Sequence, residues 1–200
     1  MNPEHPIRLQ VTDDLQRSRL TTFFRLFLAV PHFIWAYAWG IAAAVAVVIS
    51  WFATLFGGQT PDGLHQFIAR YLRYATHVNA YFYLLADPYP GFLGNTAYPV
   101  DLVVAPPAPQ RRVITAFRII LAIPVFIVAT VLGYLLPVLA VISWFVALFT
   151  ARVPLGVRNL GAWCWKFTIQ TYAYVGLLTE RYPSFDGVVA DSPNQVPSGV

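Results

Sequence analysis

Two stretches of this chain contain no charged residue, and they restrict the fold more than any other feature. The first runs from Leu26 to Thr60 and the second from Ile119 to Ala151. Over the whole chain 11% of residues are charged and 58% are hydrophobic, whereas soluble domains average about 25% charged and about 45–50% apolar. So few charges could not cover the surface of a soluble protein of this size. The sequence therefore predicts a membrane protein, which we expect in the cell membrane.

Each stretch is too long for a single upright crossing of a bilayer. With its weakly polar flanks it covers about 35–38 residues, or ~55 Å as one helix, against a hydrocarbon core of ~30 Å. One steeply tilted helix is an alternative, but typical tilts are about 20°. We expect two crossings joined by a short turn, as an apolar hairpin over residues 20–57 and again over 113–150. Gly40 and Gly133 are the expected turn positions.

The two stretches belong to an internal repeat. Aligning 5–94 with 98–187 needs no gap, and 33 of these 90 positions are identical, against about ten expected by chance in so biased a composition. We therefore divide the chain into repeat 1 (1–94), repeat 2 (95–187) and a flexible tail (188–200).

Each repeat has an arm before its hairpin and an amphipathic helix after it. Alternating apolar residues predict a short strand over 5–11, and 98–104 is its counterpart, so the two arms could pair across the repeat axis. Apolar residues three and four positions apart predict amphipathic helices over 61–86 and 154–180. Their many aromatic residues favour a position at the level of the lipid headgroups. The alternative is a further transmembrane helix packed inside the bundle.

The cations lie in short clusters beside the apolar stretches, which is typical of orientation in a membrane and not of a nucleic-acid-binding surface. We therefore expect no nucleic-acid partner. Basic flanks tend to stay cytoplasmic, and an even number of crossings in each repeat places all of them on one side. The predicted fold is all-α and multi-pass. It has four transmembrane helices, both termini in the cytoplasm, and a pseudo-two-fold axis along the membrane normal.

Several side chains are candidates for contacts at the membrane. Six cations could bind anionic lipid headgroups or a partner: Arg25, Arg118, Arg70, Arg73, Arg158 and Lys166. For Arg25 and Arg118 the alternatives are simple orientation of the helix or pairing with Asp87 and Glu180. Four aromatic residues are predicted interfacial anchors: Trp51, Trp144, Tyr89 and Tyr182. His32 is the intramembrane polar candidate, although Val125 occupies its place in repeat 2, which favours a structural role.

Three motifs carry a family resemblance. They are Arg-x5-Pro-His (25–32), Ser-Trp-Phe-x2-Leu-Phe (50–56) and Leu-Leu-x-Asp-x-Tyr-Pro-x-Phe (84–92). In this order they resemble the membrane family catalogued as domain of unknown function 4389, in two tandem copies. Repeat 2 departs from the pattern, because Val125 replaces the histidine and Glu180 replaces the aspartate. The resemblance implies architecture and membrane location, and it transfers no catalytic residue.

No spacing in the sequence predicts a catalytic centre, a metal site or a cofactor. We expect a non-enzymatic scaffold or accessory subunit that contacts anionic lipid, a partner membrane protein or further copies of itself. The alternative is a small oligomeric transporter, channel or lipid-handling protein, because parallel repeats can frame a central pathway. A lipid-modifying enzyme would need converging acid and base groups, and His77 with Asp87 is the one such pair in view.

Overall fold

The computed structural model describes residues 5–94, 97–186 and 189–190. Within them the order of elements is β1 (Ile7–Val11), α1 (Arg19–Gly57), α2 (Asp62–Phe82), β2 (Val100–Val104), α3 (Arg112–Thr150), α4 (Leu155–Val175) and β3 (Val189–Ala190). α3 begins 93 positions after the start of α1 (112 − 19 = 93) and ends 93 positions after its end (150 − 57 = 93). The same spacing separates β2 from β1 and α4 from α2, so the two repeats have the same fold.

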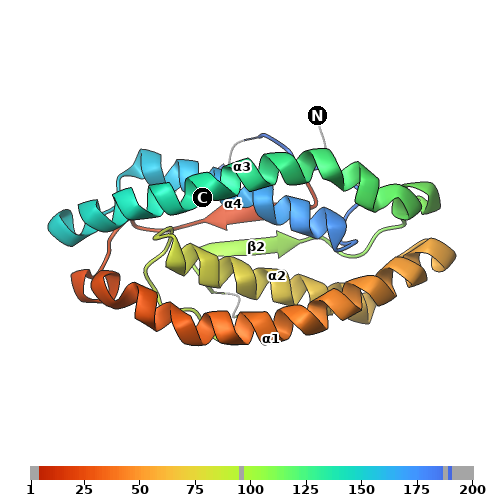
Figure 1. Cartoon of the computed structure of the whole chain (residues 1–200), viewed down its shortest axis with the longest axis horizontal. Helices are drawn as coiled ribbons and strands as arrows, with labels where there is room; N and C mark the ends of the chain where they lie inside the picture. The colour runs from red at the N-terminus through yellow and green to blue at the C-terminus, as the bar shows by residue number, and fades with distance from the viewer. Residues whose placement is uncertain (1–4, 95–96, 187–188, 191–200) are drawn as a thin grey trace, which may run out of the picture.

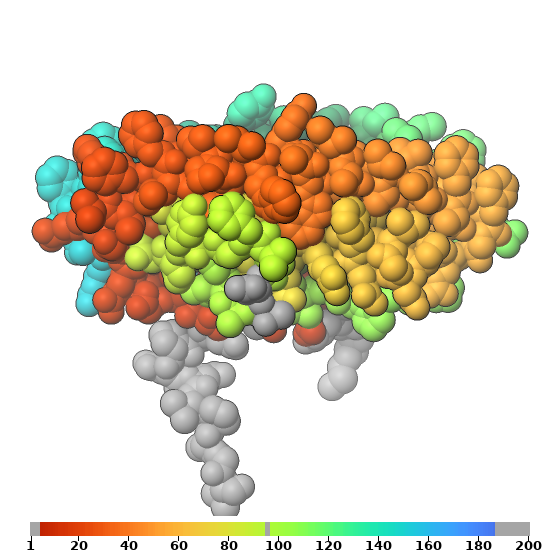
Figure 2. Space-filling model, turned by 90° about the horizontal axis from the view of Figure 1, so that it is seen from below, coloured from red at the N-terminus to blue at the C-terminus, as the bar shows by residue number. Residues whose placement is uncertain are grey.

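The elements form three layers. α1 and α3 run antiparallel in an outer layer, α2 and α4 lie behind them, and the sheet lies beyond α2 and α4 (Figure 1). α1 packs on α2 and α3 packs on α4, whereas β1 and β2 contact the middle helices. Figure 2 shows the layers from the side, with α1 along the upper edge and α2 below it. The protein therefore has a helical face and an opposite sheet face.

The sheet lies on the axis that relates the repeats. Its strand order is β2-β1-β3, with β1 antiparallel to β2 and parallel to β3. Leu9 lies opposite Leu102, and these two leucines occupy the same position in the two repeats. The repeat axis therefore passes between them, perpendicular to the sheet. The prediction that the two arms pair with each other is confirmed.

The main core lies between the sheet and the middle helices. Ile7, Leu9 and Val11 alternate with more exposed residues along β1 and are at most 2% exposed. They pack with Val100 and Leu102 of β2 against apolar residues of α2 and α4. This alternation of buried and exposed side chains is expected for a sheet that is covered by helices on one face only.

The predicted hairpins are wrong, because α1 and α3 are continuous helices without a turn at Gly40 or Gly133. A lone glycine costs a helix about 1 kcal/mol but does not end it, and the prolines within both helices are accommodated. Gly40 has a packing role instead, since a Cβ there would lie 2.8 Å from the hydroxyl oxygen of Tyr71. The described residues thus contain two helices long and apolar enough to cross a membrane, rather than four short ones.

The remaining expectations have mixed outcomes. The two predicted helices are present as α2 and α4, and each is covered by a long helix on one side and by the sheet on the other. α2 is amphipathic as predicted, whereas α4 is buried over nearly all of residues 161–174. The fold is mostly helical rather than all-α, because the arms form strands. Of the predicted tail 188–200, only Val189–Ala190 is described, as β3; the rest lies outside the described residues.

Candidate functional site: an apolar helix layer and the polar clasps behind it

The outer surface of α1 and α3 is apolar along its full length. Near the ends of α1, Leu20 and Phe56 are 70% and 72% exposed, and near the ends of α3, Val113 and Phe149 are 71% and 77% exposed. Large apolar side chains are exposed throughout the region between these ends. Monomeric soluble proteins rarely expose apolar patches of this extent.

The buried stripe of α1 consists of small and polar residues. It contains Thr22, Arg25, Ala29, His32, Ala43, Ala46, Ser50 and Thr54. A surface helix of a soluble protein shows the reverse pattern, with its apolar side toward the core. Small and polar residues inside with apolar residues outside are typical of helices that pack against other helices within lipid.

Arg25 joins the start of α1 to the turn that follows α2. It is 2% exposed, and its guanidinium donates to the backbone oxygens of Tyr81 and Ala86 at 2.6 and 2.9 Å and to Oδ1 of Asp87 at 2.7 Å. The guanidinium also lies 4.3 Å from the centre of the Tyr81 ring. Of the alternatives for Arg25, the structure shows the pairing with Asp87. Arg25 is therefore an internal residue rather than an exposed cation.

The carboxylates of Asp87 and Glu180 lie at the N-termini of the long helices. Asp87 accepts a hydrogen bond from the backbone N–H of Ser18, which precedes α1, and Glu180 accepts one from that of Arg111, which precedes α3. A carboxylate there satisfies a free N–H group and faces the positive end of the helix dipole. Partial burial raises the pKa of Glu180, but hydrogen bonds from Arg111 outweigh it and hold this pKa below its usual value.

Arg118 occupies in repeat 2 the position of Arg25. It is 1% exposed and donates to the backbone oxygens of Tyr174 and Thr179. Its third partner is Oε1 of Gln110, at 2.5 Å, and not Glu180. We call these arrangements the repeat 1 clasp (Arg17, Arg25, Asp87) and the repeat 2 clasp (Gln110, Arg118, Glu180).

Arg17 and Gln110 are equivalent clasp residues that the sequence did not reveal. Arg17 donates to the backbone oxygen of Leu84 at 2.9 Å and Gln110 to that of Leu177 at 2.7 Å. Both leucines have a left-handed backbone conformation, with φ of 57° and 59°. This conformation costs a non-glycine residue about 1–2 kcal/mol. These hydrogen bonds help to hold the turns that end α2 and α4. Arg17 and Gln110 belong to no shared sequence motif, so only the alignment of the two repeats could have shown that they occupy equivalent positions.

His32 lies in an aromatic cluster. It is fully buried, its Nδ1 is 2.9 Å from the hydroxyl of Tyr74, and its ring stacks on Phe92 at 4.3 Å. Repeat 2 has Val125 and Phe167 at the positions of His32 and Tyr74. A hydrogen-bonded pair in one repeat is thus an apolar pair in the other. This exchange indicates a packing role for His32.

Asp101 on β2 accepts hydrogen bonds from two residues of α2. Arg73 Nε donates to Oδ1 at 2.7 Å, and His77 Nε2 lies 2.9 Å from the same oxygen. Burial raises the pKa of Asp101, but Arg73 and His77 outweigh it and hold this pKa below its usual value. His77 therefore pairs with Asp101 and not with Asp87, so the acid–base pair considered for a lipid-modifying enzyme does not form. In the part of the chain that is described, no three metal-ligating side chains gather.

The structure exposes a different set of cations from the predicted one. Arg70 is exposed and Arg73 is half-buried against Asp101, whereas Arg158 and Lys166 are buried, as are Arg25 and Arg118. The exposed arginines at the ends of the long helices are Arg19, Arg111, Arg112 and Arg152. The sequence shows where the cations lie along the chain, but whether each side chain points outward or into the protein depends on how its helix packs.

Trp51 and Trp144 link the two repeats. The indole N–H of Trp51 donates to the backbone oxygen of Thr115 on α3 at 2.8 Å, and that of Trp144 donates to Thr22 on α1 at 2.9 Å. Each tryptophan thus closes the contact between the end of one long helix and the start of the other. The predicted anchors Tyr89 and Tyr182 are exposed, and their hydroxyls donate to backbone oxygens of α1 and α3.

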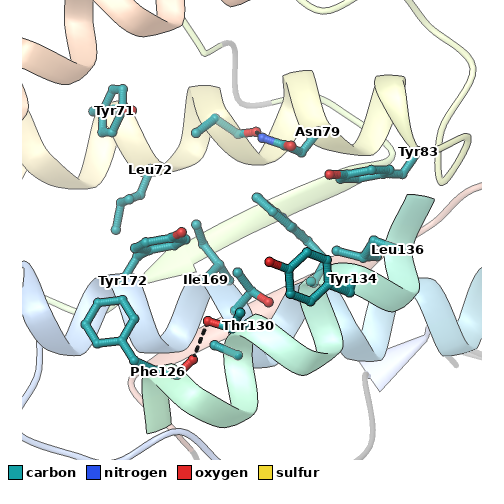
Figure 3. Close-up of a pocket in the computed structure, with 15 residues that line it drawn as sticks. Tyr71, Leu72, Asn79, Tyr83, Phe126, Thr130, Tyr134, Leu136, Ile169 and Tyr172 are labelled. Carbon is teal, nitrogen blue, oxygen red and sulfur yellow. Dashed lines mark hydrogen bonds between the residues drawn. The ribbon is translucent and has the colours of Figure 1, made fainter. Parts of the chain in front are cut away.

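A cavity of about 520 Å³ lies among α2, α3 and α4. Figure 3 shows side chains of α2 facing those of α3 and α4 across it. Apolar side chains such as Leu72 and Ile169 line it together with the polar groups of Asn79, Tyr83 and Tyr172. Its lining therefore offers both apolar contact and hydrogen-bonding groups.

These features define a class: an internally duplicated, mostly helical protein with two long apolar helices on one face and buried polar clasps behind them. The sequence profile of the family described as Domain of unknown function (DUF4389) matches residues 19–94 and 112–186. The chain belongs to this family and contains two copies of its domain. No curated protein and no solved structure matches the chain.

Proposed function

We propose that the protein is a non-enzymatic membrane scaffold or accessory protein, which binds lipid through the outer face of α1 and α3. The observation that carries this proposal is the continuous apolar surface of these two helices. Small and polar residues form the inner side of α1 and most of the inner side of α3, where Val125, Leu136 and Leu139 are the exceptions. About 25 cal/mol for each Å² of apolar surface removed from water favours its insertion into lipid. The opposite face, which carries the sheet, would remain free for a partner.

The polar groups of the described chain support a structural role. The clasps, the His32–Tyr74 pair and the Asp101 cluster each engage their side chains within the protein. They hold α1 and α3 against the middle helices. Anionic lipid would be contacted by the exposed arginines at the ends of the long helices.

We expect Arg19→Gln combined with Arg112→Gln to weaken the preference for anionic lipid. These arginines are equivalent in the two repeats, and each basic residue near an anionic surface contributes about 1 kcal/mol. The relative binding constant for phosphatidylglycerol over phosphatidylcholine should fall about fivefold at each site. Quenching of tryptophan fluorescence by brominated forms of the two lipids measures this constant.

Arg19→Lys with Arg112→Lys is the matched control, because it keeps both charges and should keep the preference. An unchanged preference in the glutamine variant would contradict lipid contact at these arginines. Failure of the wild-type protein to float with vesicles of either composition would contradict the membrane role itself.

The cavity among α2, α3 and α4 favours lipid handling as a second candidate function. Its volume of about 520 Å³ lies within the range of about 300–1,000 Å³ for small-molecule sites. Its mixture of apolar walls and hydroxyl groups suits part of a lipid molecule.

Ala75→Leu tests this second function, because Ala75 lines the cavity and a larger side chain would fill part of it. We expect at least a fivefold loss in the transfer of a fluorescent lipid between vesicles, or in lipid retained through purification. Ala42→Leu makes the same change at an exposed position of α1 and should have no effect. Equal results for the two variants would count against lipid handling through the cavity.

A further inference from the structure

The orientation of α1 and α3 in the membrane follows from their length, their end charges and the place of the sheet. We propose that both helices lie parallel to the membrane plane within one leaflet and do not cross the bilayer. The repeat axis then runs along the membrane normal, and the sheet faces the water. Such an orientation requires the membrane association proposed above, and it identifies one leaflet as the bound partner.

The length of the helices disfavours a crossing. Each has 39 residues and is therefore ~58 Å long, with apolar side chains exposed from end to end. Across a hydrocarbon core of ~30 Å such a helix would need a tilt of about 60° from the normal, whereas the usual tilt is about 20°. Within the plane of one leaflet, the whole apolar length can contact acyl chains.

The exposed arginines also disfavour a crossing. Because α1 and α3 are antiparallel (Figure 1), the start of one helix lies beside the end of the other. Arg19 and Arg152 therefore lie at one end of the protein and Arg111 and Arg112 at the opposite end, and all four are exposed. A crossing would place one pair on each side of the membrane, against the tendency of basic flanks to stay on one side.

In the in-plane orientation all four arginines lie at the rim of the protein on the same side of the membrane. There they can reach lipid headgroups from both ends of the long helices. The in-plane orientation thus satisfies the charge distribution that the four-crossing topology was meant to explain, with no crossing at all.

The position of the sheet is the strongest observation against a crossing. The repeat axis passes between Leu9 and Leu102, so the sheet lies halfway between the two ends of the long helices. In a protein that crossed along those helices, halfway is the centre of the bilayer. The exposed side chains of Gln10 and Arg70 and an open sheet would then lie in hydrocarbon, where each unsatisfied polar group costs several kcal/mol. The in-plane orientation leaves them in water.

Two cysteines at equivalent positions of the repeats test the orientation. In a Cys164→Ala background, Gln59→Cys and Arg152→Cys place one thiol at each end of the protein, and both positions are exposed. The double variant is reconstituted into sealed vesicles of phosphatidylcholine and phosphatidylglycerol and treated with a membrane-impermeant maleimide. Intact-protein mass spectrometry then counts the labels on each molecule.

For the in-plane orientation we expect two labels on each molecule that faces outward and none on each that faces the lumen. A crossing predicts one label on every molecule, whichever way it was inserted. A majority of singly labelled molecules would therefore overturn the proposal. Permeabilised vesicles should give two labels throughout, which establishes that both thiols react.

A third variant reports on the depth of the helix. Tyr37 lies on the outer face of α1 and is 74% exposed in the protein, so Tyr37→Cys should stay unlabelled in intact and in permeabilised vesicles and react only in a denaturing detergent. Labelling in permeabilised vesicles would contradict burial of this face in acyl chains. Arg19→Cys with Arg112→Cys offers a second pair if the first pair lowers the yield.

Flotation of the same samples separates the two proposals. Protein that floats with vesicles and carries one label contradicts the in-plane orientation alone. Protein that does not float contradicts both the orientation and the membrane association on which it depends.

Discussion

Replacing Arg25 with leucine is expected to lower the free energy of unfolding by about 3–5 kcal/mol, because it removes a buried guanidinium that donates to two backbone oxygens and to the partly buried carboxylate of Asp87. The substitution would remove the charged donor from the carboxylate of Asp87 and from the backbone oxygens of Tyr81 and Ala86. A change of 1 kcal/mol shifts the Tm of a protein of this size by about 2–4 °C. Thermal unfolding in mild detergent should therefore show a Tm lower by about 10 °C.

Arg112→Leu is the control for loss of an arginine near the start of a long helix. Arg112 is exposed, so its replacement should change stability by no more than about 0.5 kcal/mol. Arg25→Lys should lie between the two, because an ammonium group cannot present the planar fork of donors that reaches all three oxygens. Equal Tm values for Arg25→Leu and Arg112→Leu would contradict the clasp as a stabilising element.

Leu9→Ala is expected to destabilise the protein by about 2–5 kcal/mol, as truncation of a buried leucine usually does. Leu9 is 2% exposed and lies opposite Leu102 on the repeat axis, within the core that joins the sheet to α2 and α4. Its loss would open a cavity where the two repeats meet. Denaturant unfolding of the variant and of wild type measures the difference.

Gln10→Ala is the neighbouring control, because Gln10 is exposed on the other side of the same strand and should change stability by no more than about 0.5 kcal/mol. Leu102→Ala should resemble Leu9→Ala. Because the two leucines are partners in the sheet, the double variant should depart from the sum of the single changes. Additive and small effects would argue against a shared core on the axis.

Much of the fold follows from local patterns in the sequence. Alternation at residues 7–11 predicted a strand, and spacings of three and four predicted the helices that became α2 and α4. The gapless repeat predicted two copies of one unit and the pairing of the arms on the axis. These predictions succeed because side-chain periodicity and duplication are properties of the chain itself and do not depend on its surroundings.

The hairpins failed for a different reason. The prediction of two short helices in each apolar stretch rests on an upright crossing of the bilayer and on a turn at the central glycine. A single glycine weakens a helix by about 1 kcal/mol without ending it, and even Pro137, four residues after Gly133, is accommodated within α3. The stretch therefore stays helical throughout, and its length has to be accommodated by orientation rather than by a turn.

The candidate site was predicted only in part. The pairing of Arg25 with Asp87 was among the alternatives, and the contrast between His32 and Val125 indicated a packing role. The partner of Arg118 and the roles of Arg17 and Gln110 could not be read from the sequence, because they depend on how the turn after each middle helix meets the start of the long helix. The same is true of the hydrogen bonds between the tryptophans and the opposite repeat.

By itself the sequence determined the duplication, the strands of the arms, the two middle helices and the extent of the two long apolar stretches, since each is encoded by composition and period. That each apolar stretch is one continuous helix came from the structure. Only the tertiary structure decided which side of each helix faces outward and which arginines are buried. Packing against α2 and α4 buries one side of α1 and of α3. Arg25 and Arg118 can lie on this buried side because backbone oxygens and polar side chains accept their hydrogen bonds there. The remaining circumference is apolar, and this is the basis of the proposed lipid-facing surface.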